Sequence, residues 1–322
     1  LYNEVLLYVR VFFAAHFLLP LSFLSVALHE VWISMGVSQE VAERVVTAGA
    51  AYWNQRFVLS ESRERIERLI DVVGHANEFS PYQWAQLTAL ALEFHPDCIV
   101  EIGSGWGNST CAFVDAANQL GPPCRVVSLD NRTGSGHLAW RDSISSIVAD
   151  SWLNLLESHV GRFDEFDYES LLGGAERILI FWDAAGFDVA ESVLGQLLPV
   201  VADRPHLVAM HDMSDGQFQG PEHAQYGDRG IWKGAGSGGR LRLGPIDSGV
   251  EQALAIVDFA TRNGIELSSA DDSIHVEIGL DDERRSEMQS LLGDRLSNLQ
   301  GHWVFFTLND CPGTCTFPQN PG

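Results

Sequence analysis

The sequence has few basic residues, and they form no run. Lys and Arg together number 20, against 43 Asp and Glu in 322 residues, so the formal net charge is −23. A surface this acidic repels phosphate backbones, which disfavours nucleic acid as a partner. The ordinary consequence of such a charge is solubility, and no further function follows from it.

Cysteine is also sparse, and its spacing lacks the paired pattern with histidine that marks a zinc site. Of the five cysteines, Cys98, Cys111 and Cys124 lie in or beside predicted helices and strands, where a free thiol behaves as a small hydrophobic side chain. Cys311 and Cys315 flank a Pro-Gly turn, and a disulfide between them stays open. We expect a reduced, cytoplasmic protein.

Long apolar runs are scarce as well, and the one that stands out runs from Val11 to Leu28. Its 18 residues just reach the length of a membrane span, although His16 and Pro20 interrupt it and no small-residue cleavage site stands out. We therefore predict an apolar N-terminal segment over residues 1–34. Three alternatives stay open for it: membrane contact through residues 5–28, a packing helix, or residues upstream of a true start at Met35.

Helical and extended patterns alternate along most of the remaining chain. Apolar strands bounded by turns are typical of a parallel sheet with helices on both faces. We predict an α/β fold with a doubly wound, mostly parallel Rossmann-like sheet over residues 80–322, preceded by a helical extension over 35–79. The expected strands are 98–102, 125–131, 177–186, 206–213 and 301–310, and the expected helices are 38–73, 81–94, 109–120, 141–157, 188–202 and 249–263.

A glycine-rich loop follows the first of these strands in CIVEIGSGWGNST, residues 98–110. Gly103, Gly105 and Gly107 do not form the dinucleotide motif G-x-G-x-x-G, because the third glycine comes one residue early. Glu101 lies at the strand end, where a carboxylate can hold an ammonium, and Asp130 ends the next strand, where a carboxylate can accept ribose hydroxyls. A ligand with an ammonium and a ribose but no pyrophosphate suits this pair, and S-adenosylmethionine (SAM) is such a ligand.

The segments VEIGSGWGNST, VVSLDN, ILIFWDAAGFD and LVAMHDM follow one another along the chain. In this order they resemble the class I SAM-dependent methyltransferases, and more closely the small-molecule O-methyltransferase branch with the macrocin-type and cephalosporin-hydroxylase-like proteins. The resemblance covers roughly residues 80–310 and implies a transferase that methylates a hydroxyl of a sugar, polyketide or phenol. It also implies a set of cofactor-binding residues: Glu101, Gly103, Ser104 and Gly105 along the methionine part, Asp130 at the ribose and Asp164 near the adenine.

Acidic residues and a histidine end two later strands, at Asp183 and at the pair His211-Asp212. Ligands of such sheets bind beyond the carboxyl ends of the strands, so we expect these three residues around the acceptor hydroxyl. In catechol-type O-methyltransferases the corresponding positions hold magnesium, so the resemblance implies Asp183, His211 and Asp212 as ligands of Mg²⁺, although histidine is an unusual ligand for it. The alternatives are that His211 is a general base oriented by Asp183 or Asp212, or that the pair only caps its strand.

Two other classes of function stay open. One is a nicotinamide-dependent oxidoreductase, which the early third glycine and Glu101 disfavour. The other is a relative of the fold that binds without catalysis, because fold alone does not determine function. The segment 214–245, with Tyr226, Trp232 and a glycine-rich stretch, is predicted to be a lid over the site or else a surface loop. Self-association of the chain stays open too.

Overall fold

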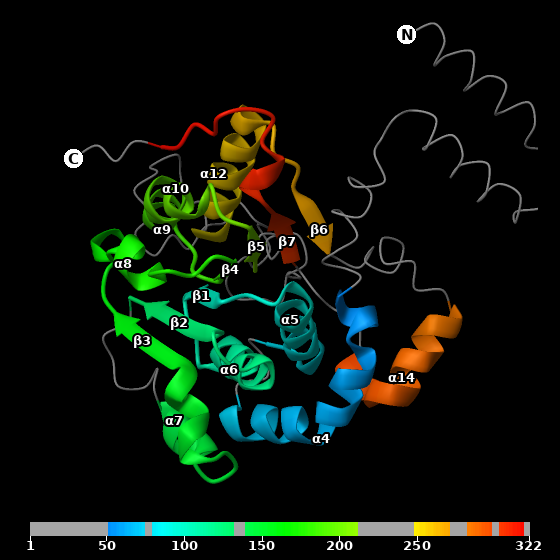
Figure 1. Cartoon of the computed structure of the whole chain (residues 1–322). Helices are drawn as coiled ribbons and strands as arrows, with labels where there is room; N and C mark the ends of the chain where they lie inside the picture. Colours follow the sequence, from blue (N-terminus) through cyan, green and yellow to red (C-terminus); the bar gives the residue numbers. More distant parts are fainter. Residues whose placement is uncertain are drawn as a thin grey trace, which may run out of the picture. The chain divides into compact units, whose positions relative to one another are not determined.

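A computed structural model describes residues 51–74, 79–131, 139–211, 248–270, 282–297 and 303–318 (Figure 1). Residues Ala48–Gly322 form one compact unit, to which every element described below belongs. The predicted segment 1–34, Asp212 and the predicted lid 214–245 lie outside the described residues. Among the described helices, none combines the length and the apolar character that a membrane crossing needs.

The described strands form one seven-stranded sheet in the order β3-β2-β1-β4-β5-β7-β6. The first five strands pair in parallel, and β7 runs antiparallel to both of its neighbours. This arrangement confirms the predicted doubly wound, mostly parallel sheet. The strands are β1 (Cys98–Ile102), β2 (Arg125–Asp130), β3 (Leu156–Val160), β4 (Ile178–Trp182), β5 (His206–Met210), β6 (Ser268–Ala270) and β7 (Trp303–Phe306).

Helices cover both faces of the sheet, and each face has its own hydrophobic core (Figure 1). Successive strand residues point to opposite faces, so Ile99 joins one core and Val100 the other. One face is covered by α4 (Arg56–Val73), α5 (Pro81–Phe94), α6 (Asn108–Leu120), α7 (Ala139–Ile144) and α14 (Asp282–Ser297). The other is covered by α8 (Tyr168–Leu172), α9 (Phe187–Ser192), η4 (Val193–Leu197), α10 (Leu198–Val201) and α12 (Ser248–Asn263).

The start of α5 follows directly from its sequence. Ser80 is the N-cap, and its hydroxyl accepts the backbone N–H of Gln83 at 3.2 Å. The Gln83 side chain in turn accepts the backbone N–H of Ser80 at 2.7 Å, which completes a capping box. Pro81 occupies the first helical position, where its missing N–H costs nothing. The observed helix has the limits 81–94 that the sequence predicts.

The predicted helix over 141–157 is wrong in most of its length. The chain forms α7, then the 3₁₀ helix η2 (Asp150–Leu155), and then the edge strand β3. β3 has the sequence LESHV, in which only the first and last residues are apolar and no residue is fully buried. An edge strand with solvent on one side carries no continuous apolar run, so its sequence did not distinguish it from a helix.

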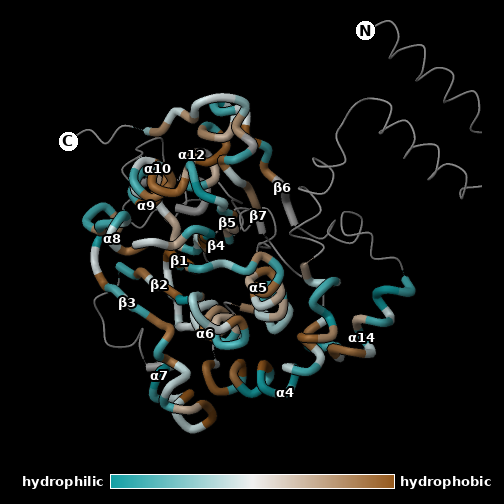
Figure 2. The backbone as a smooth tube through the Cα atoms, viewed as in Figure 1, coloured by the Kyte–Doolittle hydropathy of each residue, from teal (hydrophilic) through white to brown (hydrophobic). Residues whose placement is uncertain are grey.

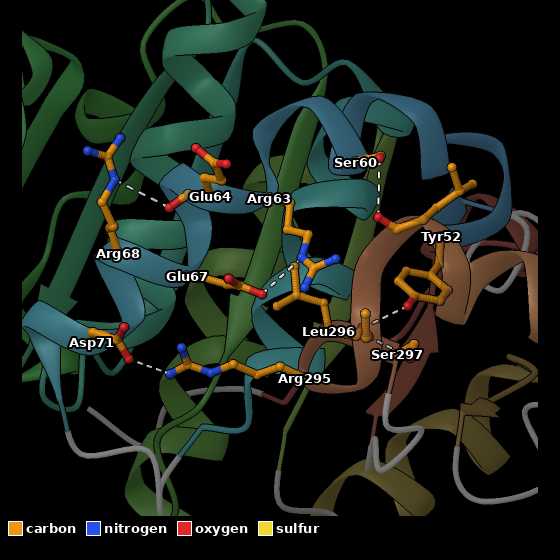
Figure 3. A network of polar contacts seen from close by, with 12 residues as sticks. Tyr52, Ser60, Arg63, Glu64, Glu67, Arg68, Asp71, Arg295, Leu296 and Ser297 are labelled. Carbon is orange, nitrogen blue, oxygen red and sulfur yellow. Dashed lines mark hydrogen bonds and ion pairs between the residues drawn. The ribbon is translucent and has the colours of Figure 1, made fainter.

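The helices α4 and α14 lie side by side although more than 200 residues separate them in the sequence (Figure 1). Along α4, hydrophobic and hydrophilic residues alternate (Figure 2), as expected for a helix with one buried face. Figure 3 shows polar contacts within and between these helices, together with that of Tyr52, which precedes α4. The Tyr52 hydroxyl donates to the Leu296 carbonyl at 2.7 Å, and Arg295 pairs with Asp71 at 2.6 Å.

Candidate active site

The carboxyl ends of β1, β2, β4 and β5 meet at one edge of the sheet, which we call the carboxyl edge. The backbone N–H of Gly103 donates to Leu129 O at 2.8 Å, and that of Asp183 donates to Ile102 O at 2.8 Å. The backbone N–H of His211 donates to Trp182 O at 3.0 Å. These bonds continue the parallel ladder by one residue, so the predicted residues after each strand come together as expected.

The glycine loop between β1 and α6 needs its glycines for the backbone and for space. Gly103, Gly105 and Gly107 all have positive φ, at 91°, 50° and 90°. A Cβ at Gly103 would lie 2.8 Å from the Asp183 carbonyl oxygen, and a Cβ at Gly107 would lie 2.4–2.5 Å from the Trp140 indole. The loop therefore touches the end of β4 on one side and α7 on the other.

Glu101 lies under this loop and is fully buried. Its carboxylate accepts hydrogen bonds from the hydroxyls of Ser109 and Thr110, both at 2.6 Å, and of Ser128 at 2.5 Å. Burial raises the pKa of Glu101 from 4.5 to about 7, while the three hydroxyl bonds act in the opposite direction. Both carboxylate oxygens thus fasten the first turn of α6 and strand β2 to β1. The predicted contact of Glu101 with a ligand ammonium stays a prediction.

Asp130 ends β2 and is almost completely buried, with 4% of its surface exposed. One of its carboxylate oxygens accepts both the backbone N–H of Ser104, at 3.1 Å, and the Ser104 hydroxyl, at 2.7 Å. The second strand therefore holds the glycine loop through its terminal acid. Ser104 and Asp130, two predicted cofactor-binding residues, therefore touch each other directly.

A pocket opens beside this pair, and its lining includes residues that the sequence did not single out. Two buried ring nitrogens in the lining, Trp140 Nε1 and His159 Nε2, have no hydrogen-bond partner among the described residues. The Glu157 carboxylate lies 4.0 Å from the histidine nitrogen, beyond hydrogen-bond distance. These two atoms are groups that a ligand or water would satisfy. The pocket is lined by Ser104, Ser128, Asp130, Trp140, Ser158, His159 and Val160.

On the β4 and β5 side of the carboxyl edge, His211 is buried between two polar partners. Its Nδ1 lies 2.9 Å from Asp183 Oδ1, and its Nε2 lies 2.8 Å from the Gln83 amide nitrogen. The Phe79 ring lies beside the imidazole, with ring centroids 5.1 Å apart. The Asp183–His211 contact agrees with the expected proximity of the two residues, whereas Gln83 comes from α5 and was not predicted.

Asp164 is placed differently from the other predicted site residues. It lies in the exposed turn η3 (Phe163–Glu165) after β3, and its carboxylate pairs with the Arg162 guanidinium at 2.7 and 2.9 Å. Its predicted place beside an adenine stays a prediction.

For magnesium, the described residues contain no group of three His, Cys, Asp or Glu side chains placed to hold a metal ion. Asp212, the third predicted ligand, lies outside them. Both ring nitrogens of His211 already have partners, so His211 could bind a cation only after Gln83 or Asp183 moved away. The site as described does not fit His211 as a magnesium ligand.

Among known proteins, this chain is similar to solved structures found by comparing folds. No family model matches the chain, and neither does any curated protein. The O-methyltransferase TomG from Streptomyces achromogenes, in complex with SAM, is 19% identical over 74% of this chain and 88% of its own, with a TM-score of 0.46. An O-methyltransferase from Bacillus cereus in complex with SAH is 16% identical over 75% and 90%, with a TM-score of 0.42. A putative caffeoyl-CoA O-methyltransferase from Staphylococcus aureus is 13% identical over 79% and 99%, with a TM-score of 0.43. These likenesses are weak, and the function of this chain has to be inferred from its own residues.

Proposed function

We propose that this chain is a SAM-dependent O-methyltransferase that methylates a hydroxyl of a small molecule. The observation that carries the proposal is the contact between Asp130, at the end of β2, and Ser104 in the glycine loop. A buried acid at the second strand end, joined to a loop of positive-φ glycines, suits a ligand that combines a ribose with backbone contacts.

The side chains around the small pocket beside Asp130 suit SAM as that ligand. Among the described residues its lining contains no Lys or Arg, and it includes two buried ring nitrogens that lack hydrogen-bond partners there. In this proposal Asp130 accepts the ribose hydroxyls, while Gly103, Ser104 and Gly105 lie along the methionine part and Glu101 near its ammonium. When bound, SAM supplies an electrophilic methyl group, so the protein has mainly to hold acceptor and methyl in line and exclude water.

The same region disfavours a nicotinamide dinucleotide. Dinucleotide-binding folds hold the pyrophosphate at the N terminus of the helix after the glycine loop. Here the Trp140 indole lies against Gly107, the N-cap of α6. The described part of the lining also offers no Lys or Arg to a pyrophosphate. An oxidoreductase is therefore the weaker alternative.

We also propose that the acceptor hydroxyl loses its proton at the β4 and β5 side of the carboxyl edge. Asp183, His211 and Asp212 are the residues assigned to it, either as ligands of Mg²⁺ or with His211 as a general base. Asp183 and His211 are hydrogen-bonded to each other directly at 2.9 Å, which favours an arrangement without a metal ion between them. A chelator separates the two, since only the metal mechanism loses its activity with a chelator and regains it with Mg²⁺. Membrane contact and self-association stay predictions from the sequence.

Titration calorimetry with SAM and, separately, with NADH tests the proposal. We expect heat of binding with SAM and none with NADH. Methyl-labelled SAM incubated with a panel of sugars, phenols and polyketides then tests transfer. Binding of NADH alone would replace the proposal by an oxidoreductase, and binding of SAM without transfer to any acceptor would favour a binding relative of the fold.

A further inference from the structure

Gln83 connects the N terminus of α5 to the end of β5. It is 6% exposed and comes 128 residues before His211 in the sequence. Its side-chain oxygen accepts the Ser80 backbone N–H at 2.7 Å, and its side-chain nitrogen lies 2.8 Å from His211 Nε2. One side chain thus serves both the capping box of a helix and the proposed active site.

The capping box determines which way the Gln83 amide faces. A backbone N–H can only donate, so the atom opposite Ser80 N has to be the amide oxygen. The amide NH₂ group is therefore the one that faces His211, and an NH₂ group can only donate. His211 Nε2 has to be the acceptor of this bond, and it carries no proton.

With Nε2 unprotonated, the ring proton of neutral His211 lies on Nδ1. Nδ1–H then donates to Asp183 Oδ1 at 2.9 Å, which is the bond that a carboxylate acceptor requires. Free histidine prefers the other tautomer, with the proton on Nε2, so the surroundings have to impose this one. Phe79 covers the ring, and only 8% of the His211 side chain is exposed, so water competes weakly for these bonds.

We propose that Gln83 makes His211 a positioning residue, which acts by donating from Nδ1 to Asp183. The hydrogen bonds run in one direction, from Ser80 N–H to Gln83, from Gln83 to His211, and from His211 to Asp183. Because Gln83 occupies the lone pair of Nε2, His211 in this arrangement neither accepts a proton from the acceptor nor binds a cation. Asp183, whose carbonyl oxygen lies close to Gly103, is the group that the chain of bonds orients. The catalytic part of this inference rests on the proposed methyltransferase function.

The tautomer itself can be measured without any ligand. In the full chain labelled with ¹⁵N-histidine, at a pH about two units above the ordinary histidine pKa of about 6.5, His211 should show a protonated Nδ1 and an unprotonated Nε2. Gln83→Glu keeps an acceptor for Ser80 N–H but turns a carboxylate toward Nε2, so Nε2 should gain a proton. Ser80→Ala, the control, removes the capping hydroxyl and should leave both ring signals in place.

A wild-type His211 with its proton on Nε2 would overturn the inference, as would ring signals that Gln83→Glu does not change. These outcomes do not depend on SAM. If the chain proves not to bind SAM, the proposed function fails while the tautomer result stands.

The role of each nitrogen in catalysis is tested by a matched pair of substitutions. The amide of His211→Asn can donate from the place of Nδ1, whereas the amide of His211→Gln reaches only the place of Nε2. With an acceptor from the methyl-transfer panel, we expect His211→Asn to lose about tenfold in rate. We expect His211→Gln to lose at least about 10²-fold, because Asp183 then loses the donor that positions it. Equal losses in both variants, or no loss in either, would contradict a positioning role through Nδ1.

Discussion

The carboxyl edge and the layer formed by α4 and α14 both carry many polar contacts, but the two regions differ in burial. At the edge, Glu101, Asp130 and His211 are each at most 6% exposed, and their partners lie within the protein. Between the helices, the Asp71 and Arg295 side chains are 60% and 38% exposed (Figure 3). Water competes for the second kind of contact and hardly for the first.

This difference in burial should determine how much each polar contact contributes to stability. A buried acid that loses its partners keeps the full cost of desolvation, whereas an exposed one is solvated again. The polar groups of the carboxyl edge should therefore be sensitive to small changes, and those of the helix layer tolerant, with Tyr52 as a buried exception.

The largest effect is expected at the glycine loop. In Gly107→Ala the new methyl would lie within 2.5 Å of the Trp140 ring, at a residue with φ of 90°. The clash and the backbone strain together should lower the free energy of unfolding by about 2–5 kcal/mol. Denaturant unfolding measures this change.

Gly174→Ala is the matched control, because Gly174 has no positive φ and no atom within 4 Å of its added Cβ. It should change stability by less than about 0.5 kcal/mol. Adding Trp140→Ala to Gly107→Ala should cost less than the two separate losses combined. Simple additivity would show that the indole is not the obstacle.

The next largest effect is expected at Glu101, because its raised pKa makes the stability of the fold depend on pH. Its pKa is raised to about 7 in the folded chain, so between pH 4.5 and 7 the folded state binds a proton that the unfolded state has lost. This contribution to stability is present below pH 4.5 and disappears as the pH rises through 7. It should amount to about 3 kcal/mol.

Unfolding measured from pH 5 to 8 in the wild type and in Glu101→Gln isolates this contribution, because glutamine does not titrate. The difference between the two curves should change with pH in the stated direction. Parallel curves would mean that Glu101 is ionised in the folded state throughout this range.

A smaller effect is expected at the buried Tyr52, which precedes α4 and contacts α14. Tyr52→Phe removes the hydroxyl that donates to the Leu296 carbonyl and leaves that oxygen without this donor. The loss should be about 1–2 kcal/mol in denaturant unfolding. A neutral result would place this contact with the exposed ones and weaken the comparison between the two regions.

The smallest effect is expected for Asp71→Asn. This change breaks the exposed ion pair with Arg295, which should cost less than about 0.5 kcal/mol. The remaining difference should vanish in high salt, because exposed pairs are screened. A loss comparable to that of Tyr52→Phe would show that exposure is a poor guide to these contacts.

The sequence predicted the parts of the fold whose side chains repeat with a clear period. Strand β4 is a continuous apolar run, and β1, β2 and β5 each contain three or four apolar residues. The predicted limits of these four strands agree with the structure closely at their first residues. β6 and α14 were not predicted: β6 has three residues, SSA, and α14 is mostly polar with a non-helical Gly293. Their burial depends on neighbours that are distant in the sequence, which periodicity does not show.

The same distinction applies to the candidate site. Glu101 and Asp130 lie within the last two residues of their strands. Ser104, Asp183 and His211 follow strands by one or two residues, so the rule that strand ends meet was enough to bring all five together. Gln83, Trp140 and His159 reach the edge from a helix on the covering layer, from α7 and from the unpredicted strand β3. No local pattern marks them, because packing alone decides their position.

The central claim is that SAM binds at the β1 and β2 side of the carboxyl edge. The most direct test is titration calorimetry with SAM on the wild type, Asp130→Ala and Ser104→Ala. Ser104→Ala keeps the carboxylate and the backbone N–H, so it controls for damage to the loop. We predict that Asp130→Ala weakens binding by about 1.5–3 kcal/mol, the value of hydrogen bonds to a charged group, and that Ser104→Ala weakens it less. A folded Asp130→Ala variant that binds SAM as tightly as the wild type would contradict the account.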